Sequence, residues 1–493
     1  MVRSRLLFMW LAIALCASIA PGAEWKIVRE HWYALEIGGS RAGHSHEIVE
    51  RNADQVRITS TTSMRMQRFD ADVAIDIVEV SIERDDGTPV LLSSSSKMSK
   101  QDKSTTWRFD GDSVEIETAD GGRERTTRRE LPEGDWMMPW ASSEFVMQRA
   151  ASGADVIEVR TMSIDQGMNI VPSRLTKLTE EVSTFDGRDV PVMVFRVESA
   201  DTAGLNVISK FSEDGVLTEQ VIDLPMGEMV SRLVTKEQAL NGGGPAPEIM
   251  VSMFVPLERA LPRLDRTRHL TLEIRAKDGE LPELPSVGAQ RVTRHDDGRS
   301  ARVLIDLDDP VPATDDERAD VAYREASAII DSDDPMIKAL ARKATRRKGD
   351  DPMKRAEAMR ALAERHVSRK GFETAFASAS ETARLRRGDC SEHAVLLAAM
   401  LRADGIPSRT ATGLVYVEGM GPEKYAYGWH MWTQALIDGA WIDLDATLPL
   451  TYHVGHLLVD TNSLADDAPA EGINGLLRLL GNLEIDVVER GSD

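Results

Sequence analysis

Residues 25–240 are patterned as short strands: apolar and polar side chains alternate over brief stretches, and glycine-containing pairs separate these stretches. Successive side chains of a β-strand point to opposite faces of its sheet, so this alternation is typical of strands with one buried face. The alternating positions include Tyr33, Leu35, Ile37, Val73, Ile75 and Ile77. The separating pairs, which two-residue hairpin turns favour, are Gly38-Gly39, Asp86-Gly87, Asp186-Gly187 and Asp214-Gly215. No helical pattern of comparable strength interrupts the region, so the sequence predicts an antiparallel all-β domain over residues 24–240.

Beyond this region the pattern changes. Glycine and proline crowd residues 241–247, which we interpret as a linker. Apolar residues then alternate again at Leu270, Leu272 and Ile274. We therefore expect a small β module over residues 248–313.

Helices are predicted after residue 314. Asp334-Pro335 and Asp351-Pro352 each combine an aspartate suited to cap a helix with a proline suited to its first turn. We expect helices and a mixed core over residues 314–460 and a C-terminal tail over residues 461–493. The predicted fold class is α+β, with an N-terminal antiparallel all-β region ahead of this core.

The segment with the most chemical information is Arg387-Gly388-Asp389-Cys390-Ser391-Glu392-His393. Asp389 is suited to be an N-cap, and Glu392, three residues later, can complete a capping box. Apolar residues follow, and Gly405 is placed to end the helix. Cys390 is thus predicted in the first helical turn, where free amide groups and the positive end of the helix dipole favour a thiolate. A cysteine that only packs would fit better in the middle of the helix.

A thiolate nucleophile needs an imidazole partner and a group that orients the imidazole. Residues 430–437 are patterned as a strand that begins with a histidine, and Asp438-Gly439 is a strong two-residue hairpin turn. Residues 441–447 are patterned as the returning strand and contain two aspartates. The hairpin therefore brings a histidine and candidate carboxylates together.

The two-residue turn predicts the register of this hairpin. Ile437 would pair with Ala440 across the turn. Counting back along both strands, Asp445 falls on the same face as His430, one diagonal step away. That diagonal is about 7 Å between backbones, within reach of a side-chain hydrogen bond. The register therefore favours Asp445 over Asp443 as the orienting carboxylate.

Together these motifs resemble the transglutaminase-like superfamily. The resemblance covers about residues 334–458, and cysteine, histidine and aspartate occur in the family's order. The motifs that carry it are the Gly-Asp-Cys helix, Arg402-Ala403-Asp404-Gly405-Ile406-Pro407-Ser408-Arg409, Gly428-Trp429-His430-Met431-Trp432 and Asp445-Ala446-Thr447. Residue by residue, the resemblance implies Cys390 as nucleophile, His430 as general base and acid, and Asp445 as orienting residue. Ala446 departs from the family's motif, which has proline after the aspartate.

The resemblance also implies a papain-like α+β core and a reaction on amides of peptides or proteins. The thiolate would form a thioester, His430 would protonate the departing amine, and water or a second amine would resolve the thioester. The backbone amide of Cys390 is the candidate oxyanion donor, and a second donor is not evident. Family members include cross-linking enzymes, peptidases, amidases and inactive relatives. We favour hydrolysis over transamidation, because the sequence has no evident amine-acceptor site and no EF-hand calcium loop. No cofactor is implied.

Structural zinc is an alternative use of the cysteine. Cys390 with His393, and His453 with His456, have the three-residue spacing of zinc-ligand pairs. The two pairs lie far apart in the chain, whereas structural zinc sites use compact paired ligands. We therefore expect no metal.

Several aromatic and charged residues have both a functional and a structural interpretation. The tryptophans near the histidine could line a binding cleft, two arginines could bind substrate carboxylates, and two histidines share a strand face. We expect packing for Trp429, Trp432 and Trp441, solvated side chains for Arg387 and Arg409, and a surface pair without a role for His44 and His46.

The first residues predict export. Arginines precede an apolar run from Leu6 to Ala17, and small residues follow, as in a secretory signal peptide over residues 1–23. No stretch reaches the ~18 apolar residues of a membrane span, so we expect a periplasmic or extracellular chain without an integral membrane segment. Signal removal would also remove Cys16 and leave Cys390 as a single cysteine without an internal disulfide partner.

Charge argues against nucleic acid as a partner. The chain has 59 basic and 81 acidic residues and a net charge of −22, whereas phosphate binding needs an excess of cations. The remaining alternative to an enzyme is an envelope binding or scaffold protein that uses the large β domain and has an inactive core. We favour the enzyme, because Cys390, His430 and Asp445 are all present.

Overall fold

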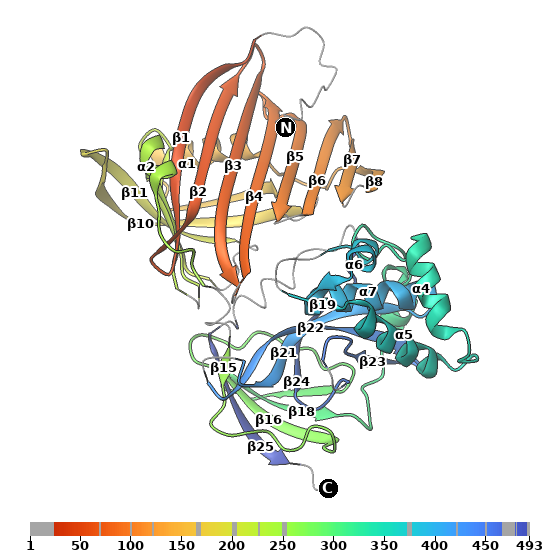
Figure 1. Cartoon of the computed structure of the whole chain (residues 1–493). Helices are drawn as coiled ribbons and strands as arrows, with labels where there is room; N and C mark the ends of the chain where they lie inside the picture. The colour runs from red at the N-terminus through yellow and green to blue at the C-terminus, as the bar shows by residue number, and fades with distance from the viewer. Residues whose placement is uncertain are drawn as a thin grey trace, which may run out of the picture.

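The computed structural model describes residues 24–68, 71–98, 101–120, 123–163, 169–199, 205–224, 227–248, 254–371, 377–420, 423–448, 451–465, 479 and 481–490. The signal peptide expected over residues 1–23, with Cys16, lies outside the described residues. Figure 1 shows a strongly curved β-sheet in one lobe and a mixed lobe of smaller sheets and helices. No helix in the described ranges has the length and apolar character needed to cross a membrane.

The N-terminal sheet confirms the predicted antiparallel region. Neighbouring strands follow one another in sequence, except that β1 pairs with β14 in the middle of the sheet. The strands are β1 (Lys26–Ile37), β2 (Ser40–Arg51), β3 (Gln55–Arg68), β4 (Ala71–Arg84), β5 (Pro89–Met98), β6 (Gln101–Asp110), β7 (Ser113–Asp120), β8 (Arg123–Glu130), β9 (Val156–Ser163), β10 (Asn169–Phe185), β11 (Arg188–Ser199), β12 (Val207–Ser212), β13 (Leu217–Ile222) and β14 (Met229–Val234).

A helix that the sequence did not predict interrupts this region. Helix α1 (Pro139–Ala151) lies between β8 and β9, and its N-cap residue provides no capping side chain. Instead, the carboxylate of Glu83 on β4 accepts hydrogen bonds from the backbone N–H groups of Trp140 at 2.7 Å and Ala141 at 3.1 Å. The cap comes from a distant strand, so the local sequence marks this helix start with Pro139 in the first turn but with no capping side chain. Helix α2 (Lys236–Asn241) follows the last strand of this sheet.

The C-terminal region contains three further sheets in the described residues. The first holds β15 (Val255–Pro256), β21 (Ser408–Glu418), β22 (Tyr425–Ile437), β23 (Ala440–Leu444) and β24 (His456–Asn462). The second holds β16 (His269–Ala276), β17 (Gln290–Arg294), β18 (Ser300–Asp306) and β25 (Leu483–Arg490), and the third holds β19 (Arg369–Lys370) and β20 (Arg387–Gly388). Strand β25 pairs with β16, so the segment expected to be a C-terminal tail completes the sheet of the small β module.

Helices α3 (Asp315–Ala319), α4 (Pro335–Thr345), α5 (Pro352–His366), α6 (Ala379–Leu385) and α7 (Cys390–Ala403) belong to this second lobe, where α4 to α7 gather on one side in Figure 1. A short 3-10 helix, η2, covers Val321–Tyr323. The predicted N-caps are confirmed, because Asp334 and Asp351 each accept a backbone N–H in the first turn of α4 and α5. Helix α7 is surrounded by protein: its side chains from Val395 to Leu401 are all fully buried.

Candidate active site

Cys390 is the first residue of the buried helix α7, and its side chain is partly exposed. The predicted capping box is confirmed. The carboxylate of Asp389 accepts the backbone N–H of Ser391 at 2.8 Å, and the carboxylate of Glu392 accepts the backbone N–H of Asp389 at 2.8 Å. These contacts fix the start of the helix, and with it the position of the thiol.

Glu392 also packs against Gly388, just before the helix. A Cβ atom on Gly388 would lie 2.3 Å from Cβ of Glu392, so this position accepts only glycine. The second oxygen of the Glu392 carboxylate accepts the backbone N–H of Ala377 at 3.1 Å. Burial and the nearby charge of Asp389 raise the pKa of Glu392 to about 7.

His430 lies on β22 with 6% of its surface exposed. Its Nε2 atom lies 2.8 Å from Oδ2 of Asp445, and the thiol of Cys390 forms a hydrogen bond with the same ring. Because Nε2 faces the carboxylate, Nδ1 is the ring nitrogen left for the thiol. Burial lowers the pKa of His430, but the charges and hydrogen bonds of Asp445 and Cys390 outweigh burial and raise that pKa to about 10.

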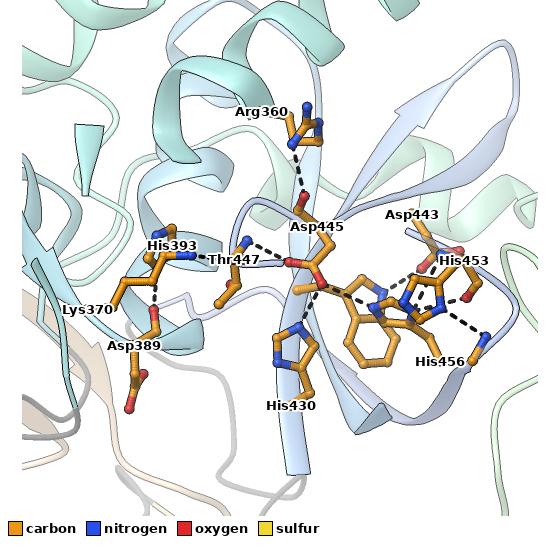
Figure 2. A network of polar contacts seen from close by, with 12 residues as sticks. Arg360, Lys370, Asp389, His393, His430, Asp443, Asp445, Thr447, His453 and His456 are labelled. Atoms are coloured by element: carbon orange, nitrogen blue, oxygen red, sulfur yellow. Dashed lines mark hydrogen bonds and ion pairs between the residues drawn. The ribbon is translucent and has the colours of Figure 1, made fainter. Parts of the chain in front are cut away.

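Asp445 follows the end of β23 and is fully buried. Its Oδ1 atom accepts the backbone N–H of Thr447 at 2.7 Å, and its backbone carbonyl accepts a hydrogen bond from Arg360 of α5 at 3.3 Å. Figure 2 shows these contacts converging on Asp445 from several elements. Burial would raise the pKa of the Asp445 carboxyl, but contact with His430 and His456 lowers it well below its usual range, so Asp445 is ionised.

The hairpin has the predicted register near its turn. Ile437 pairs with Ala440, and the ladder continues regularly until β23 ends at Leu444. Asp445 therefore approaches His430 from just beyond the strand, where the prediction had the strand continuing. Asp443 does not contact His430: its carboxylate accepts hydrogen bonds from the indole of Trp432 and the amide of Gln434, both at 2.8 Å.

His456 is a residue of this cluster to which the sequence reasoning gave no role beside the triad. It is fully buried at the start of β24, and its Nε2 atom lies 3.1 Å from Oδ2 of Asp445. His430, Asp445 and His456 converge closely enough to be considered as metal ligands. Hydrogen bonds already account for this convergence, because the carboxylate accepts one from each ring. The position of His456 depends on β24 pairing with β21, which no local motif indicates.

The residues considered as zinc ligands make separate contacts with other parts of the chain. Nδ1 of His393 contacts the carbonyl of Asp389 at 2.6 Å, while Nδ1 of His453 accepts the backbone N–H of Gly455 at 3.1 Å. Within the described ranges, Cys390, His393, His453 and His456 do not form a common group of possible ligands.

The expectation of a solvated Arg409 is wrong. Arg409 is 3% exposed, lies 4.0 Å from the ring centre of Trp441, and pairs with Glu317 at 2.8 Å. Trp432 and Trp441 are buried in a common cluster, as expected for packing residues. His44 and His46 lie in the N-terminal sheet, on β2, where both rings stack on Trp32.

Cys390, His430 and Asp445 thus come together from a helix start, a strand and the end of a hairpin. A thiol in contact with an imidazole, which a carboxylate holds from the other side, has the parts for nucleophilic attack on an acyl group.

No curated protein matches the chain by sequence. Among solved structures, the chain is similar to a β-barrel-like protein of a domain of unknown function from Brucella abortus, with 12% identity, a TM-score of 0.33, and coverage of 42% of this chain and 95% of that one. It is also similar to a candidate cysteine protease from Cytophaga hutchinsonii, with 18% identity, a TM-score of 0.27, and coverage of 45% and 86%. A third similar structure is the periplasmic domain of TgpA from Pseudomonas aeruginosa bound to ethylmercury, with 16% identity, a TM-score of 0.26, and coverage of 39% and 87%.

The family model described as the transglutaminase-like superfamily matches residues 338–446. This range contains Cys390, His430 and Asp445. Residues 338–446 therefore belong to the transglutaminase-like superfamily.

Proposed function

We propose that this protein is an exported, cysteine-dependent amide hydrolase or acyl transferase that acts on peptides or proteins. Cys390 is the proposed nucleophile, His430 the general base and acid, and Asp445 the orienting residue. One observation carries the proposal: the buried ring of His430 contacts the thiol of Cys390 and, 2.8 Å from its Nε2 atom, the buried carboxylate of Asp445.

In the proposed reaction, the thiol proton moves to Nδ1 of His430 as sulfur attacks the carbonyl carbon of an amide. Negative charge develops on the carbonyl oxygen, for which the backbone N–H of Cys390 at the start of α7 is the candidate donor. His430 then gives the proton to the leaving amine as the C–N bond breaks, and a thioester remains on sulfur. Water or a second amine attacks the thioester carbon while His430 accepts its proton. The C–S bond then breaks, the new acid or amide leaves, and His430 returns the proton to sulfur. Asp445 holds the Nε2–H of His430 throughout.

Hydrolysis is the favoured second step, because the sequence offers no evident site for an acceptor amine. The proposed steps use groups of the chain itself and water, so they require no cofactor. Export rests on the signal-like pattern of residues 1–23.

Covalent labelling tests the proposal. In a chain that lacks residues 1–23, and therefore Cys16, Cys390 is the single cysteine. We expect iodoacetamide to label the folded protein faster than the protein unfolded in urea, with mass spectrometry locating the label on Cys390. Cys390→Ala should lose both the label and the release of amines from a peptide mixture. Unchanged amidase activity in Cys390→Ala refutes the proposal.

Trapping identifies the substrate. Acid quenching of the wild-type protein during turnover stops water from attacking, so an acyl group on Cys390 should stay there as a thioester. Mass spectrometry of protein quenched during incubation with a peptide mixture should find an adduct on Cys390. His430→Ala, which lacks the acid for the leaving amine, and Cys390→Ala should carry none.

The alternative is an envelope binding protein with an inactive core. A cavity of about 1150 Å³ in the N-terminal lobe gives this alternative a location; its lining includes Trp136, Phe145 and Arg160. The labelling experiment separates the two, because an inactive core predicts that Cys390 reacts no faster in the folded protein than in the unfolded chain.

A further inference from the structure

A second buried imidazole lies against Asp445. His456 is fully buried, and its Nε2 atom approaches Oδ2 of Asp445 at 3.1 Å, the oxygen that Nε2 of His430 contacts at 2.8 Å. Figure 2 shows both rings directed at this carboxylate. The reaction proposed above uses only His430, so it leaves His456 without a role.

Hydrogen-bond geometry indicates how many protons the ring of His456 carries. Its Nδ1 atom lies 3.0 Å from the backbone carbonyl oxygen of His453, and a carbonyl can only accept. The backbone amide of His453 is 3.5 Å from the same nitrogen, at the limit for a hydrogen bond. The contact with the carbonyl is the shorter of the two, so we assign a hydrogen to Nδ1. Nε2 faces an ionised carboxylate, which also only accepts, so both ring nitrogens donate.

From this geometry, and resting on the function proposed above, we propose that His456 is an imidazolium that positions Asp445 and balances its charge. Charge counting supports this. The reactive state holds a thiolate, the imidazolium of His430 and the carboxylate of Asp445, which leaves one uncompensated negative charge in a buried site. A positive His456 brings the sum to zero, which lowers the cost of burying the group. Sharing Asp445 between two rings also lets His430 release its proton to the leaving amine more easily.

The other groups around His456 are consistent with a single charged ring. The ring centre of Tyr452 lies 4.4 Å away, that of His453 4.5 Å, and that of His430 5.7 Å. Burial, reinforced by the charge of His456, lowers the pKa of His453 to about 3, so His453 is neutral. Burial raises the pKa of Asp443, which its neighbours Trp432 and Gln434 hold by hydrogen bonds. Asp445 is thus the carboxylate that faces His456 directly.

The test is the pH dependence of the rate at which iodoacetamide labels Cys390, in the full mature chain. In His456→Gln the side-chain amide can still donate to Asp445 but carries no charge. Without the positive charge, the thiol ionises at higher pH and His430 loses its proton at higher pH. Both limbs of the rate profile should therefore move up by about half a pH unit or more. His31→Gln, on β1 of the N-terminal sheet, is the control and should leave the profile in place.

A rate profile that is unchanged in His456→Gln overturns the inference, because it would show that a neutral donor to Asp445 replaces His456 without any effect of the lost charge. If His456→Gln does not fold, the wild-type protein with ¹⁵N-labelled histidine decides: both ring nitrogens of His456 should give imidazolium shifts, and a neutral-ring pattern overturns the inference. Failure of the proposed function is a separate result, since it appears as slow labelling of Cys390 in the wild-type protein.

A second observation concerns the surface that leads to the nucleophile. Strands β19 and β20 pair in parallel, with Arg369 opposite Arg387 and Lys370 opposite Gly388, and β20 runs directly into the capping residue of α7. Arg369 and Lys370 are exposed. Figure 2 places Lys370 beside His393, one turn after Cys390.

Lys370 and the nearby Arg386 donate to backbone carbonyls. Lys370 donates to the backbone carbonyl of Thr447 at 2.5 Å, and the exposed Arg386 donates to the carbonyl of His366 at 3.0 Å. Across the described part of the chain, Arg369, Lys370 and Arg386 have no carboxylate partner.

We infer, again resting on the proposed function, that the site favours acyl donors with negative charge near the reacting amide, such as acidic peptides. Local positive charge raises the concentration of anions at the thiol and lowers the energy of an anionic complex. The same field should act on small reagents that differ only in charge.

The experiment compares iodoacetate, an anion, with neutral iodoacetamide on Cys390 at low ionic strength. The ratio of the two rates cancels changes in thiol reactivity. Replacing Arg369 and Arg386 together by glutamine should lower this ratio by about threefold or more, and added salt should lower it in the wild type. Lys343→Gln, exposed on α4, is the matched control. An unchanged ratio with normal labelling overturns this inference alone, whereas no labelling by either reagent overturns the proposed function and the inference together.

Discussion

Each oxygen of the Asp445 carboxylate has a defined donor. Oδ1 accepts the backbone N–H of Thr447, and Oδ2 accepts from His430 and His456. The side chain is fully buried, so water cannot replace a lost partner. Substitutions that remove one of these partners should therefore lower stability as well as activity, so both must be measured.

Asp445→Asn should reduce labelling of Cys390 and amidase activity by about 10³-fold, because a neutral amide neither stabilises the imidazolium of His430 nor fixes its tautomer. The measurement is the labelling rate at pH 7 together with thermal unfolding. Asp443→Asn is the matched control, since burial raises the pKa of Asp443 and its contacts are to Trp432 and Gln434. Equal losses in both variants would contradict a specific role for Asp445.

The sequence was informative where the determinants are local. The capping box of Asp389 and Glu392 places Cys390 at a helix start, and a two-residue turn allows the strand positions to be counted. His456 could not be placed in this way, because it reaches Asp445 only through pairing of β24 with β21. Arg409 was misjudged for a similar reason: its partner Glu317 lies far away in the chain.

At the scale of elements, some helix starts depend on local residues and others on residues far away in the sequence. The helices α4, α5 and α7 carry their own capping aspartates, and the sequence predicts their starts. Helix α1 has no local cap, and the carboxylate of Glu83 serves from another strand. Pro139 in its first turn is a local sign of this helix, but no capping residue precedes it, and the start was not predicted. The stability of the helix depends on one buried acid.

Glu83 should make the N-terminal lobe less stable as pH rises. Burial raises the pKa of the Glu83 carboxyl, and the hydrogen bonds from the backbone N–H groups of Trp140 and Ala141 lower it. Burial has the larger effect, so the pKa rises from 4.5 to about 7. Between these pH values the folded state keeps a proton that the unfolded chain has lost, so the stability from Glu83 is full below about pH 4.5 and falls as pH rises to about 7. The loss is on the order of 2–3 kcal/mol.

Glu83→Gln should remove this dependence, because glutamine does not titrate and can still accept the amide hydrogen bonds. Urea unfolding at pH 5 and at pH 8, followed by tryptophan fluorescence, measures it. The stability of the wild type relative to Glu83→Gln should be lower at pH 8 than at pH 5. A constant difference between the two proteins at both pH values would show that Glu83 keeps its usual pKa. Glu30→Gln, on exposed surface of β1, serves as control.

The cap on α7 can be tested in a similar way. Asp389→Ala removes the side chain that accepts the backbone N–H of Ser391, which should cost about 1 kcal/mol of unfolding free energy. Because this cap also positions Cys390, labelling should slow while the helix persists. Asp351→Ala, which removes the cap of α5, is the matched control and should lower stability without slowing labelling. Equal labelling rates in Asp389→Ala and Asp351→Ala would show that the Asp389 cap does not position the thiol of Cys390.

At the scale of the whole molecule, the antiparallel region and the α+β class follow from patterns that repeat along the chain. The closing strand of the second lobe does not. Strand β25 joins β16 across more than two hundred residues of sequence. Long-range pairings of this kind depend on tertiary packing, so a short apolar segment near a terminus gives no local sign of its partner.

The pairing of β25 links the C-terminus to the candidate active site. Leu483, Ile485 and Val487 are buried in the cluster that also contains Leu414 of β21 and Tyr427 of β22. Strand β22 carries His430. The last strand therefore supports the sheet from which the histidine reaches the thiol.

Ending the chain after residue 480 should destabilise the second lobe and slow the labelling of Cys390. The truncation removes three buried apolar side chains, each worth roughly 1.5–3 kcal/mol, and opens the edge of β16 to other chains. Thermal unfolding, light scattering and the labelling rate should all change together. A chain that ends after Arg490 keeps all of β25 and should behave as the wild type. If the chain ending at 480 kept its melting temperature and its labelling rate, then β25 would be peripheral and the sheet of β21 and β22 would hold His430 without it.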